Sequence, residues 1–326
     1  MRSFNLRMVV NAALAGTCLA SPLAPVAIPL IDFQNINLYS QYAAAAYCNA
    51  NNNGTLNPST TLTCAGTGSQ SNCPLVEGSR CSNDTENSRS IFSSPTYGTA
   101  CFVAVDDTNK RIVVSFRGTD ARRYPKTALP NIFSVGVQNP VPQYCAGCAA
   151  AKGYSEAFGE VNTTVINAVI ALRRDANRSG YQVVTTGHSL GGAVSTFAAL
   201  ELRRMGIPVH AASFGMPRTA NPQLADFISA QDANPNPNVN PQQRNYRVIH
   251  RGDFIPDSLP LSILGRESRH ITPSFNITTD NTAVPGANDI TIVTINGTSQ
   301  QTGVTDSQNI YQVAHAFYLG PISKCN

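Results

Sequence analysis

The chain has 326 residues, a formal net charge of +4 and a hydrophobic fraction of 42%. This length and apolar fraction fit one large α/β domain better than two average domains. The Lys and Arg residues are scattered along the chain, with no more than two in succession and no basic stripe among aromatics, and this argues against a nucleic-acid partner.

The first twenty residues have the pattern of a secretory signal peptide. Two arginines precede an apolar run over residues 8–19, and small residues follow where a signal peptidase cleaves. The run is too short to span a bilayer, and prolines recur directly after it. We therefore predict a signal peptide at residues 1–20, a short prosegment at 21–35 and a single secreted domain over 36–326.

Removal of the signal peptide leaves eight cysteines, an even set that suits disulfides in an exported protein. A zinc site is the competing interpretation of Cys145-Ala-Gly-Cys148, but no second such pair and no His pair with ligand spacing completes a tetrahedral shell. We predict no metal and no cofactor. Six Asn-x-Ser/Thr sequons are compatible with secretion from a eukaryote: Asn53, Asn83, Asn162, Asn177, Asn276 and Asn296.

The first predicted elements precede any recognisable motif. A short helix is expected at residues 38–47, followed by cysteine-containing loops as far as about residue 95. Strands at 99–105 and 111–116, joined by a polar turn, form a hairpin candidate. Apolar residues at helical spacing then predict one helix from residue 154 to about residue 177.

Strands and helices alternate in the second half of the chain. This alternation favours an α/β fold with a central, mostly parallel sheet flanked by helices. An Asn- and Pro-rich stretch at residues 232–243 has no apolar face and is expected to be an exposed loop. The predicted strands are 181–186, 209–214 and 247–250, and the predicted helices are 191–205 and 222–231.

The segment Gly187-His188-Ser189-Leu190-Gly191 matches the G-x-S-x-G nucleophile elbow of α/β-hydrolases. In that motif a strand turns sharply into a helix and exposes the serine oxygen, and the glycines prevent clashes at the turn. A predicted buried strand precedes the motif and a predicted helix follows it. We therefore predict an α/β-hydrolase fold with Ser189 as nucleophile, in preference to a glycine-rich helix start with a capping serine.

A serine nucleophile needs a histidine base, which lies late in the chain of α/β-hydrolases. His210 and His250 fall within predicted strands, so each is more readily explained as structural. His315 lies among small residues near the end of the chain and is the preferred base. His270 is its competitor because it lies in a predicted loop.

The acid of the triad comes between the serine and the histidine in chain order. Asp253 follows the predicted strand at 247–250, at the end where catalytic groups gather in open α/β sheets. Asp257 is the closest rival. Four further downstream aspartates are expected to be solvated: Asp226, Asp280, Asp289 and Asp306.

An acyl-transfer site also needs donors for the developing oxyanion. The backbone amide of Leu190, directly after the nucleophile, is the first candidate. Thr119 follows the strand at 111–116 and can offer its amide and its hydroxyl. The competing interpretation of Arg117-Gly118-Thr119 is a turn that merely ends the strand.

Several motifs in one order resemble the secreted filamentous-fungal class 3 lipases, over residues 38–325. The resemblance implies a triad of Ser189, Asp253 and His315, with Thr119 and Leu190 as the oxyanion hole. The motifs are Phe116-Arg-Gly-Thr119, Gly187-His-Ser-Leu-Gly-Gly192, Phe214-Gly-Met-Pro-Arg218, His250-Arg-Gly-Asp253 with Pro256 and Leu259-Pro260, and the late His315.

The same resemblance implies disulfide pairings and a lid. It pairs Cys145 with Cys148, Cys48 with Cys325 and Cys64 with Cys73, and leaves Cys81 and Cys101 to each other. These lipases carry a short amphipathic lid helix with a tryptophan after the oxyanion residue. Here the matching segment, residues 121–130, contains two prolines that oppose a helix, and the chain has no Trp. We therefore expect a loop.

These features predict a secreted, monomeric, cofactor-free serine esterase. It is expected to hydrolyse acylglycerols at a lipid–water interface, as a triacylglycerol lipase does. Feruloyl esterases resembling this family have a more polar lid segment, so a feruloyl esterase or another carboxylesterase is the alternative. A non-catalytic lipid- or wall-binding protein with the same fold is a further alternative, because fold does not fix function.

Overall fold

The computed structural model describes residues 27–52, 62, 75, 89–92, 96–119, 138–232, 244–257, 262–263, 266–280, 283–293 and 313–323. The predicted signal peptide, the predicted lid segment at 121–130 and most of the Asn- and Pro-rich loop lie outside these residues. The same holds for Asp306 and for four of the cysteines: Cys64, Cys73, Cys81 and Cys325.

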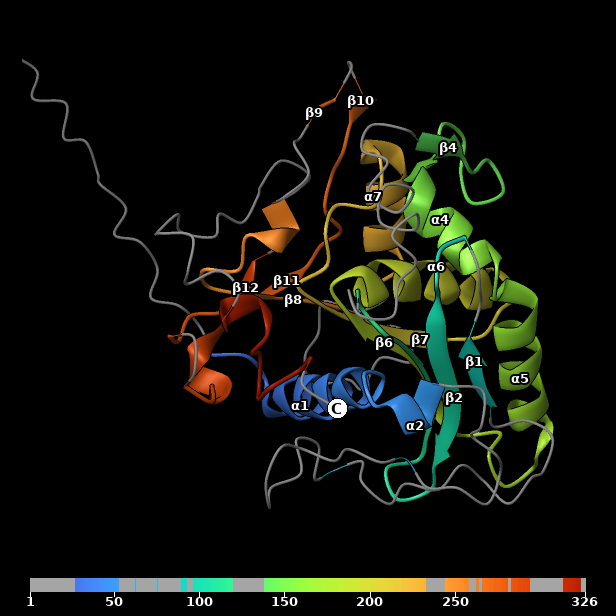
Figure 1. Ribbon diagram of the computed structural model, residues 1–326, viewed down its shortest axis with the longest axis horizontal. Helices are drawn as coiled ribbons and strands as arrows, with labels where there is room; N and C mark the ends of the chain where they lie inside the picture. The colour runs from blue at the N-terminus through green and yellow to red at the C-terminus, as the bar shows by residue number, and fades with distance from the viewer. Residues whose placement is uncertain are drawn as a thin grey trace, which may run out of the picture.

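An eight-stranded sheet forms the centre of the described fold, in the order β1-β2-β3-β6-β7-β8-β11-β12 (Figure 1). Neighbouring strands from β3 to β11 run parallel, and β1, β2 and β12 pair antiparallel at the two edges. The predicted parallel sheet is thereby confirmed. The strands are β1 (Arg89–Phe92), β2 (Ala100–Asp106), β3 (Arg111–Phe116), β6 (Gln182–His188), β7 (Val209–Phe214), β8 (Arg244–His250), β11 (Ser274–Ile277) and β12 (Ile290–Val293).

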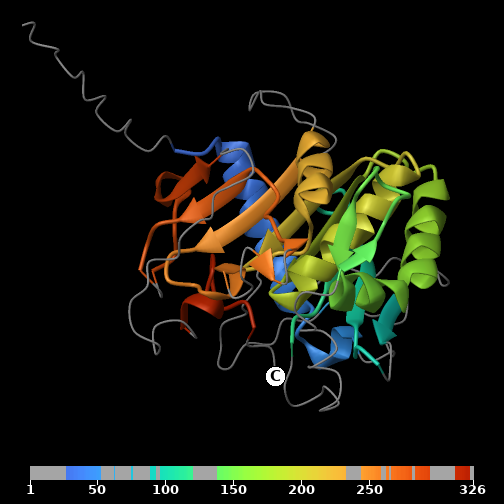
Figure 2. The ribbon, with the colours of Figure 1, turned by 90° about the horizontal axis from the view of Figure 1, so that it is seen from above.

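Helices cover both faces of this sheet (Figures 1 and 2). Helix α1 packs on one face, and α4, α5, α6 and α7 lie over the other. Because side chains alternate along a strand, Cys101 and Phe102 of β2 enter two different buried clusters, one on each face. The helices are α1 (Leu30–Ala45), α2 (Asn49–Asn52), α4 (Lys152–Gly159), α5 (Asn162–Arg174), α6 (Leu190–Arg204) and α7 (Pro222–Ala230).

Short elements complete the described fold. Two small antiparallel ladders pair β4 with β5 and β9 with β10, and two single 3-10 turns are present. Among the described residues, no helix is long and apolar enough to cross a membrane. The short elements are β4 (Gln138–Pro140), β5 (Ala149–Ala151), β9 (Ser262–Ile263), β10 (Arg266–Glu267), η1 (Ile255–Asp257) and η2 (Ala287–Asp289).

Helix α1 begins at Leu30 rather than at residue 38, where the sequence placed its start. Its first turns bury Asp32, which accepts hydrogen bonds from Arg244 (2.9 Å) and from the hydroxyl of Tyr246 (2.9 Å). Asn35 donates to the same hydroxyl at 3.1 Å. Asp32 and Asn35 are thus buried because they form hydrogen bonds with residues of β8. Buried polar residues of this kind interrupt the apolar period that marks a helix in the first turns of α1.

The helix predicted from residue 154 to about 177 is two helices, α4 and α5. Gly159 ends α4, consistent with the low helix propensity of glycine. Val161 lies between the helices with φ −116° and is 2% exposed, so it is buried in the core although it is not part of a helix. The helical spacing of apolar residues therefore continues across the junction, and the sequence pattern does not reveal that one helix ends and another begins there.

The cysteines follow the predictions only in part. Cys145 and Cys148 form a disulfide, as expected, and Cys48 is also disulfide-bonded. The expected pairing of Cys81 with Cys101 is wrong, because Cys101 is a free cysteine. It lies on β2 with no exposed surface and packs as a small apolar side chain in the core.

Candidate active site

The candidate site forms where neighbouring parallel strands end at one edge of the sheet. The register pairs Phe116 of β3 with Gly187 of β6, and His188 of β6 with Phe214 of β7. Phe214 is in turn opposite Val248 of β8. The segments that follow these strands therefore lie side by side, which brings together regions far apart in the sequence.

Ser189 occupies the turn between β6 and α6 in a backbone conformation that few non-glycine residues adopt, with φ 56° and ψ −126°. Its amide donates to the carbonyl of Phe214 at 2.8 Å, which anchors the turn to the next strand. A Cβ on Gly191 would lie 2.2 Å from the carbonyl oxygen of Phe116, and one on Gly187 would lie 2.3 Å from Gly191. Only glycine fits at both positions, as the elbow motif requires.

His315 and Asp253 lie in direct contact. Nδ1 of His315 is 2.8 Å from Oδ2 of Asp253, and the Asp253 side chain has no exposed surface while that of His315 is 19% exposed. A carboxylate can only accept, so Nδ1 carries the proton and Nε2 is left as the base in the neutral ring. The other oxygen, Oδ1, accepts from the amide of Ile255 at 2.9 Å.

Ser189 is a neighbour of this pair through the residue that precedes it. Nε2 of His188 lies 2.7 Å from the carbonyl oxygen of His315, and the two imidazole rings have centroids 4.4 Å apart. The sequence-predicted nucleophile, base and acid are therefore gathered at one edge of the sheet.

Space for this cluster depends on Gly215, the first residue after β7. Its φ is +61°, and a Cβ built there would lie 2.4 Å from the hydroxyl of Tyr318 and 2.7 Å from Oδ2 of Asp253. The glycine lets the backbone pass directly behind the acid and thus admits His315 beside it.

The two predicted oxyanion donors also lie at this edge. Leu190 is the first residue of α6, where backbone N–H groups have no partner within the helix. Thr119 is partly exposed and follows Gly118, whose Cβ would lie 2.7 Å from the carbonyl oxygen of His188. The end of β3 therefore packs closely against the elbow.

The competing histidines are bound to other partners. His210 lies 2.7 Å from the hydroxyl of Tyr39, and His270 contacts the carbonyl of Pro256. His250 is buried at the end of β8. These positions fit the structural roles that the sequence suggested for His210 and His250, and they leave His315 beside the acid.

The rival acids are engaged in ion pairs or turns. Asp257 binds Arg218 at 2.6 Å, and Asp226 faces Arg269 at 3.4 Å. Asp289 accepts from the amide of Gly286. Of the described acids, Asp253 is the one that contacts His315.

Tyr318 is part of the cluster although sequence reasoning did not select it. Its hydroxyl donates to Oδ2 of Asp253 at 2.6 Å, and burial next to that carboxylate raises the pKa of Tyr318 well above its usual value. It lies three residues after His315, beyond the short helical segment at 313–315, and no local motif in the sequence marks it.

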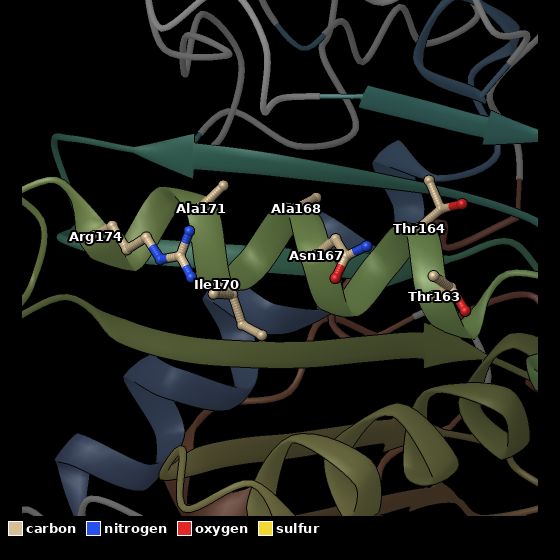
Figure 3. Close-up of a pocket in the computed structure, with 7 residues that line it drawn as sticks. All are labelled: Thr163, Thr164, Asn167, Ala168, Ile170, Ala171 and Arg174. Carbon is tan, nitrogen blue, oxygen red and sulfur yellow. The ribbon is translucent and has the colours of Figure 1, made fainter.

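A separate cavity of about 450 Å³ lies along α5 (Figure 3). It contains none of the residues of the candidate site, so we do not assign the substrate to it. The residues that line it are Thr163, Thr164, Asn167, Ala168, Ile170, Ala171 and Arg174.

Comparison with known proteins identifies the family. Residues 113–262 match the family model described as lipase (class 3). A secreted mono- and diacylglycerol lipase A of Penicillium cyclopium is 30% identical over 264 residues, which cover 80% of this chain and 76% of that protein. A secreted mono- and diacylglycerol lipase 1 of Fusarium solani is 32% identical over 77% of this chain and 65% of that protein.

The fold leads to the same group. The crystal structure of a mono- and diacylglycerol lipase from Aspergillus oryzae superposes with a TM-score of 0.72 at 30% identity, over 91% of this chain and all of that one. The relatives are named as secreted lipases, in agreement with the predicted export of this chain. The chain belongs to the class 3 lipase family, a group of ester-hydrolysing enzymes with the α/β-hydrolase fold.

Proposed function

We propose that this protein hydrolyses acylglycerols with Ser189 as nucleophile, His315 as general base and Asp253 as the acid that orients it. The contact of 2.8 Å between Nδ1 of His315 and the buried Asp253, beside the strained Ser189, carries the proposal. Asp253 fixes the ring with Nε2 free to take the serine proton, and it stabilises the imidazolium that forms.

The reaction then follows acyl transfer. Oγ of Ser189 attacks the ester carbonyl while His315 takes its proton, and the amides of Thr119 and Leu190 stabilise the oxyanion. The C–O bond breaks as His315 returns the proton to the leaving alcohol. A water molecule, deprotonated by the same base, attacks the acyl-enzyme, releases the fatty acid and restores Ser189.

We further propose that mono- and diacylglycerols are substrates, because the relatives with the matching fold and length carry those substrates in their names. The predicted triacylglycerol activity and the feruloyl esterase alternative are distinguished by one panel: emulsified mono-, di- and triacylglycerols and methyl ferulate. Hydrolysis of the ferulate alone would contradict the proposal. We propose that the enzyme is a monomer, which gel filtration tests. We also propose that it acts at the lipid–water interface.

The role of Ser189 is tested by Ser189→Ala, with Ser195→Ala as the matched control. Ser195 is a buried serine of α6, the helix that follows Ser189, and its hydroxyl donates to the carbonyl of Gly192 at 2.9 Å. We expect Ser189→Ala to lower kcat by about 10⁴-fold or more while the folded protein is still secreted. Ser195→Ala should keep its activity. Unchanged turnover by Ser189→Ala would refute the assignment.

A further inference from the structure

Two side chains that the triad does not include form a chain of bonds behind it. Tyr47, two residues after the end of α1, has its hydroxyl 2.7 Å from Nδ1 of His188. Nε2 of His188 lies 2.7 Å from the carbonyl oxygen of His315. The chain thus runs from the N-terminal helix, through the residue before the nucleophile, to the backbone of the general base.

The chemistry of these contacts fixes the tautomer of His188. A carbonyl oxygen can only accept, so Nε2 must carry a proton. In the neutral ring Nδ1 then accepts from the hydroxyl of Tyr47. Burial and the nearby His315 lower the pKa of His188 well below its usual value, so the ring is neutral and does not compete for the proton that His315 receives.

Tyr47 also contacts the segment that supplies the proposed oxyanion donor. A Cβ on Gly118 would lie 2.0 Å from the hydroxyl of Tyr47 and 2.7 Å from the carbonyl of His188. Gly118, one residue before Thr119, is therefore enclosed between the two members of the chain. Tyr47 and His188 therefore contact the segment of the proposed oxyanion donor Thr119, and His188 also contacts the backbone of the proposed base His315.

We propose that Tyr47 and His188 are positioning residues for catalysis: the Tyr47 hydroxyl holds the His188 tautomer whose Nε2–H fixes the backbone of His315. This inference rests on the proposed role of His315 as base. Without the hydroxyl, His188 can move its proton to Nδ1. Nε2 would then face the carbonyl of His315 as a second acceptor at 2.7 Å, and the two would repel each other.

The protein contains a matched control for this arrangement. Tyr39 lies on α1, eight positions before Tyr47, and its hydroxyl is 2.7 Å from Nδ1 of His210, the same bond at the same length. Both partners are buried, and His210 lies within β7, away from the strand end that carries the site. If both tyrosine–histidine pairs had a purely structural role, removal of either hydroxyl would have the same effect on the melting temperature and on kcat.

The experiment compares Tyr47→Phe with Tyr39→Phe in the full-length secreted protein, using a soluble short-chain ester and the melting temperature. We expect Tyr47→Phe to lower kcat by about 10- to 100-fold with KM changed less than about twofold. Tyr39→Phe should lower the melting temperature to a similar extent and leave kcat within about twofold of the wild type.

A second pair of variants keeps the test independent of the tyrosine. His188→Phe keeps a ring but removes the donor to His315, while the amide of His188→Gln can still donate. We expect a larger loss of kcat in His188→Phe than in His188→Gln. Equal kcat in Tyr47→Phe and Tyr39→Phe, or equal loss in both His188 variants, would overturn the inference. Activity in Ser189→Ala would instead refute the proposed function.

Discussion

Tyr318 donates its hydroxyl to Oδ2 of Asp253 at 2.6 Å, and this is the same oxygen that lies 2.8 Å from Nδ1 of His315. One carboxylate oxygen is therefore held from two sides, by a tyrosine and by the proposed base. Together with the amide of Ile255 on Oδ1, these donors offset the cost of burying the charge.

The first prediction is that Tyr318→Phe weakens this arrangement. Removal of a donor from a buried carboxylate should lower the free energy of unfolding by about 1.5–3 kcal/mol, measured by urea denaturation. It should also reduce kcat, because Asp253 gains freedom to rotate away from His315. Tyr42→Phe is the control, since Tyr42 donates to the buried Asp106 at 2.5 Å elsewhere in the core. An equal loss of kcat in both variants would contradict a specific role for Tyr318.

The second prediction concerns crowding behind the acid. Gly215→Ala places a methyl group 2.4 Å from the hydroxyl of Tyr318, so we expect a loss of kcat of at least about tenfold together with a lower melting temperature. Gly206→Ala has the same kind of backbone strain, with φ +78°, but nothing lies within 4 Å of its new Cβ. It should lose stability and keep kcat. Comparable kcat values for the two variants would show that strain alone acts.

The sequence was sufficient to predict the elbow and the strand β7, because their signals are local. Glycines at fixed offsets around Ser189 report a steric need that holds within a few residues. The parallel order of the central strands follows from the alternation of strands and helices. His315 was selected by its late position in the chain, and its contact with Asp253 depends on how the strand ends meet in space.

Other features could not be read from local pattern. Strand β11 is short, carries Asn276, and is placed by pairing with β8 on one side and β12 on the other, with Ile277 opposite His250 of β8. The roles of Tyr47 and Tyr318 depend on contacts across 141 and 65 positions of the chain. No period or motif in one sequence encodes such long-range hydrogen bonds, and a buried tyrosine looks the same as a core aromatic.

The third prediction addresses the start of the mature protein. Asp32 is buried and paired with Arg244, so its removal would leave a buried guanidinium with the weaker partner Asp232 at 3.5 Å. We expect Asp32→Asn to lower the free energy of unfolding by about 3 kcal/mol.

For the same reason we expect the secreted chain to retain Asp32, which intact-mass measurement tests. An N-terminus at residue 36, the sequence-based domain boundary, would contradict this prediction.

The fourth prediction concerns glycans, for which the sequence offers six sequons. Asn177 is exposed in the turn after α5, so we expect a glycan there when the protein is made in a eukaryotic secretory host. Asn276 lies inside the sheet on β11, and its Oδ1 is buried. We expect no glycan at that position. Peptide mass spectrometry after enzymatic deglycosylation distinguishes the two sites, and a modified Asn276 with an unmodified Asn177 would reverse the expectation.

The fifth prediction is a loss of stability in acid that originates in buried histidines. Burial lowers the pKa of His188, His250 and His270 from the usual value of 6.5. Below about pH 6.5 the unfolded chain therefore binds protons that the folded chain does not. Stability is fully present above that pH and falls as the pH drops toward the folded-state pKa values, by up to about 1.4 kcal/mol per pH unit for each histidine.

Carboxylates with lowered pKa values act in the same direction, so a variant is needed to isolate the histidine contribution. His270→Gln can keep the donor to the carbonyl of Pro256, which lies 2.9 Å from Nε2, but it cannot titrate. Urea denaturation at about pH 7.5, 6.5 and 5.5 should give a smaller decline for His270→Gln than for the wild type, by up to about 1.4 kcal/mol per pH unit. Because the glutamine removes one proton-binding site from the unfolded chain, parallel declines for the two proteins would mean that His270 is already protonated in the fold.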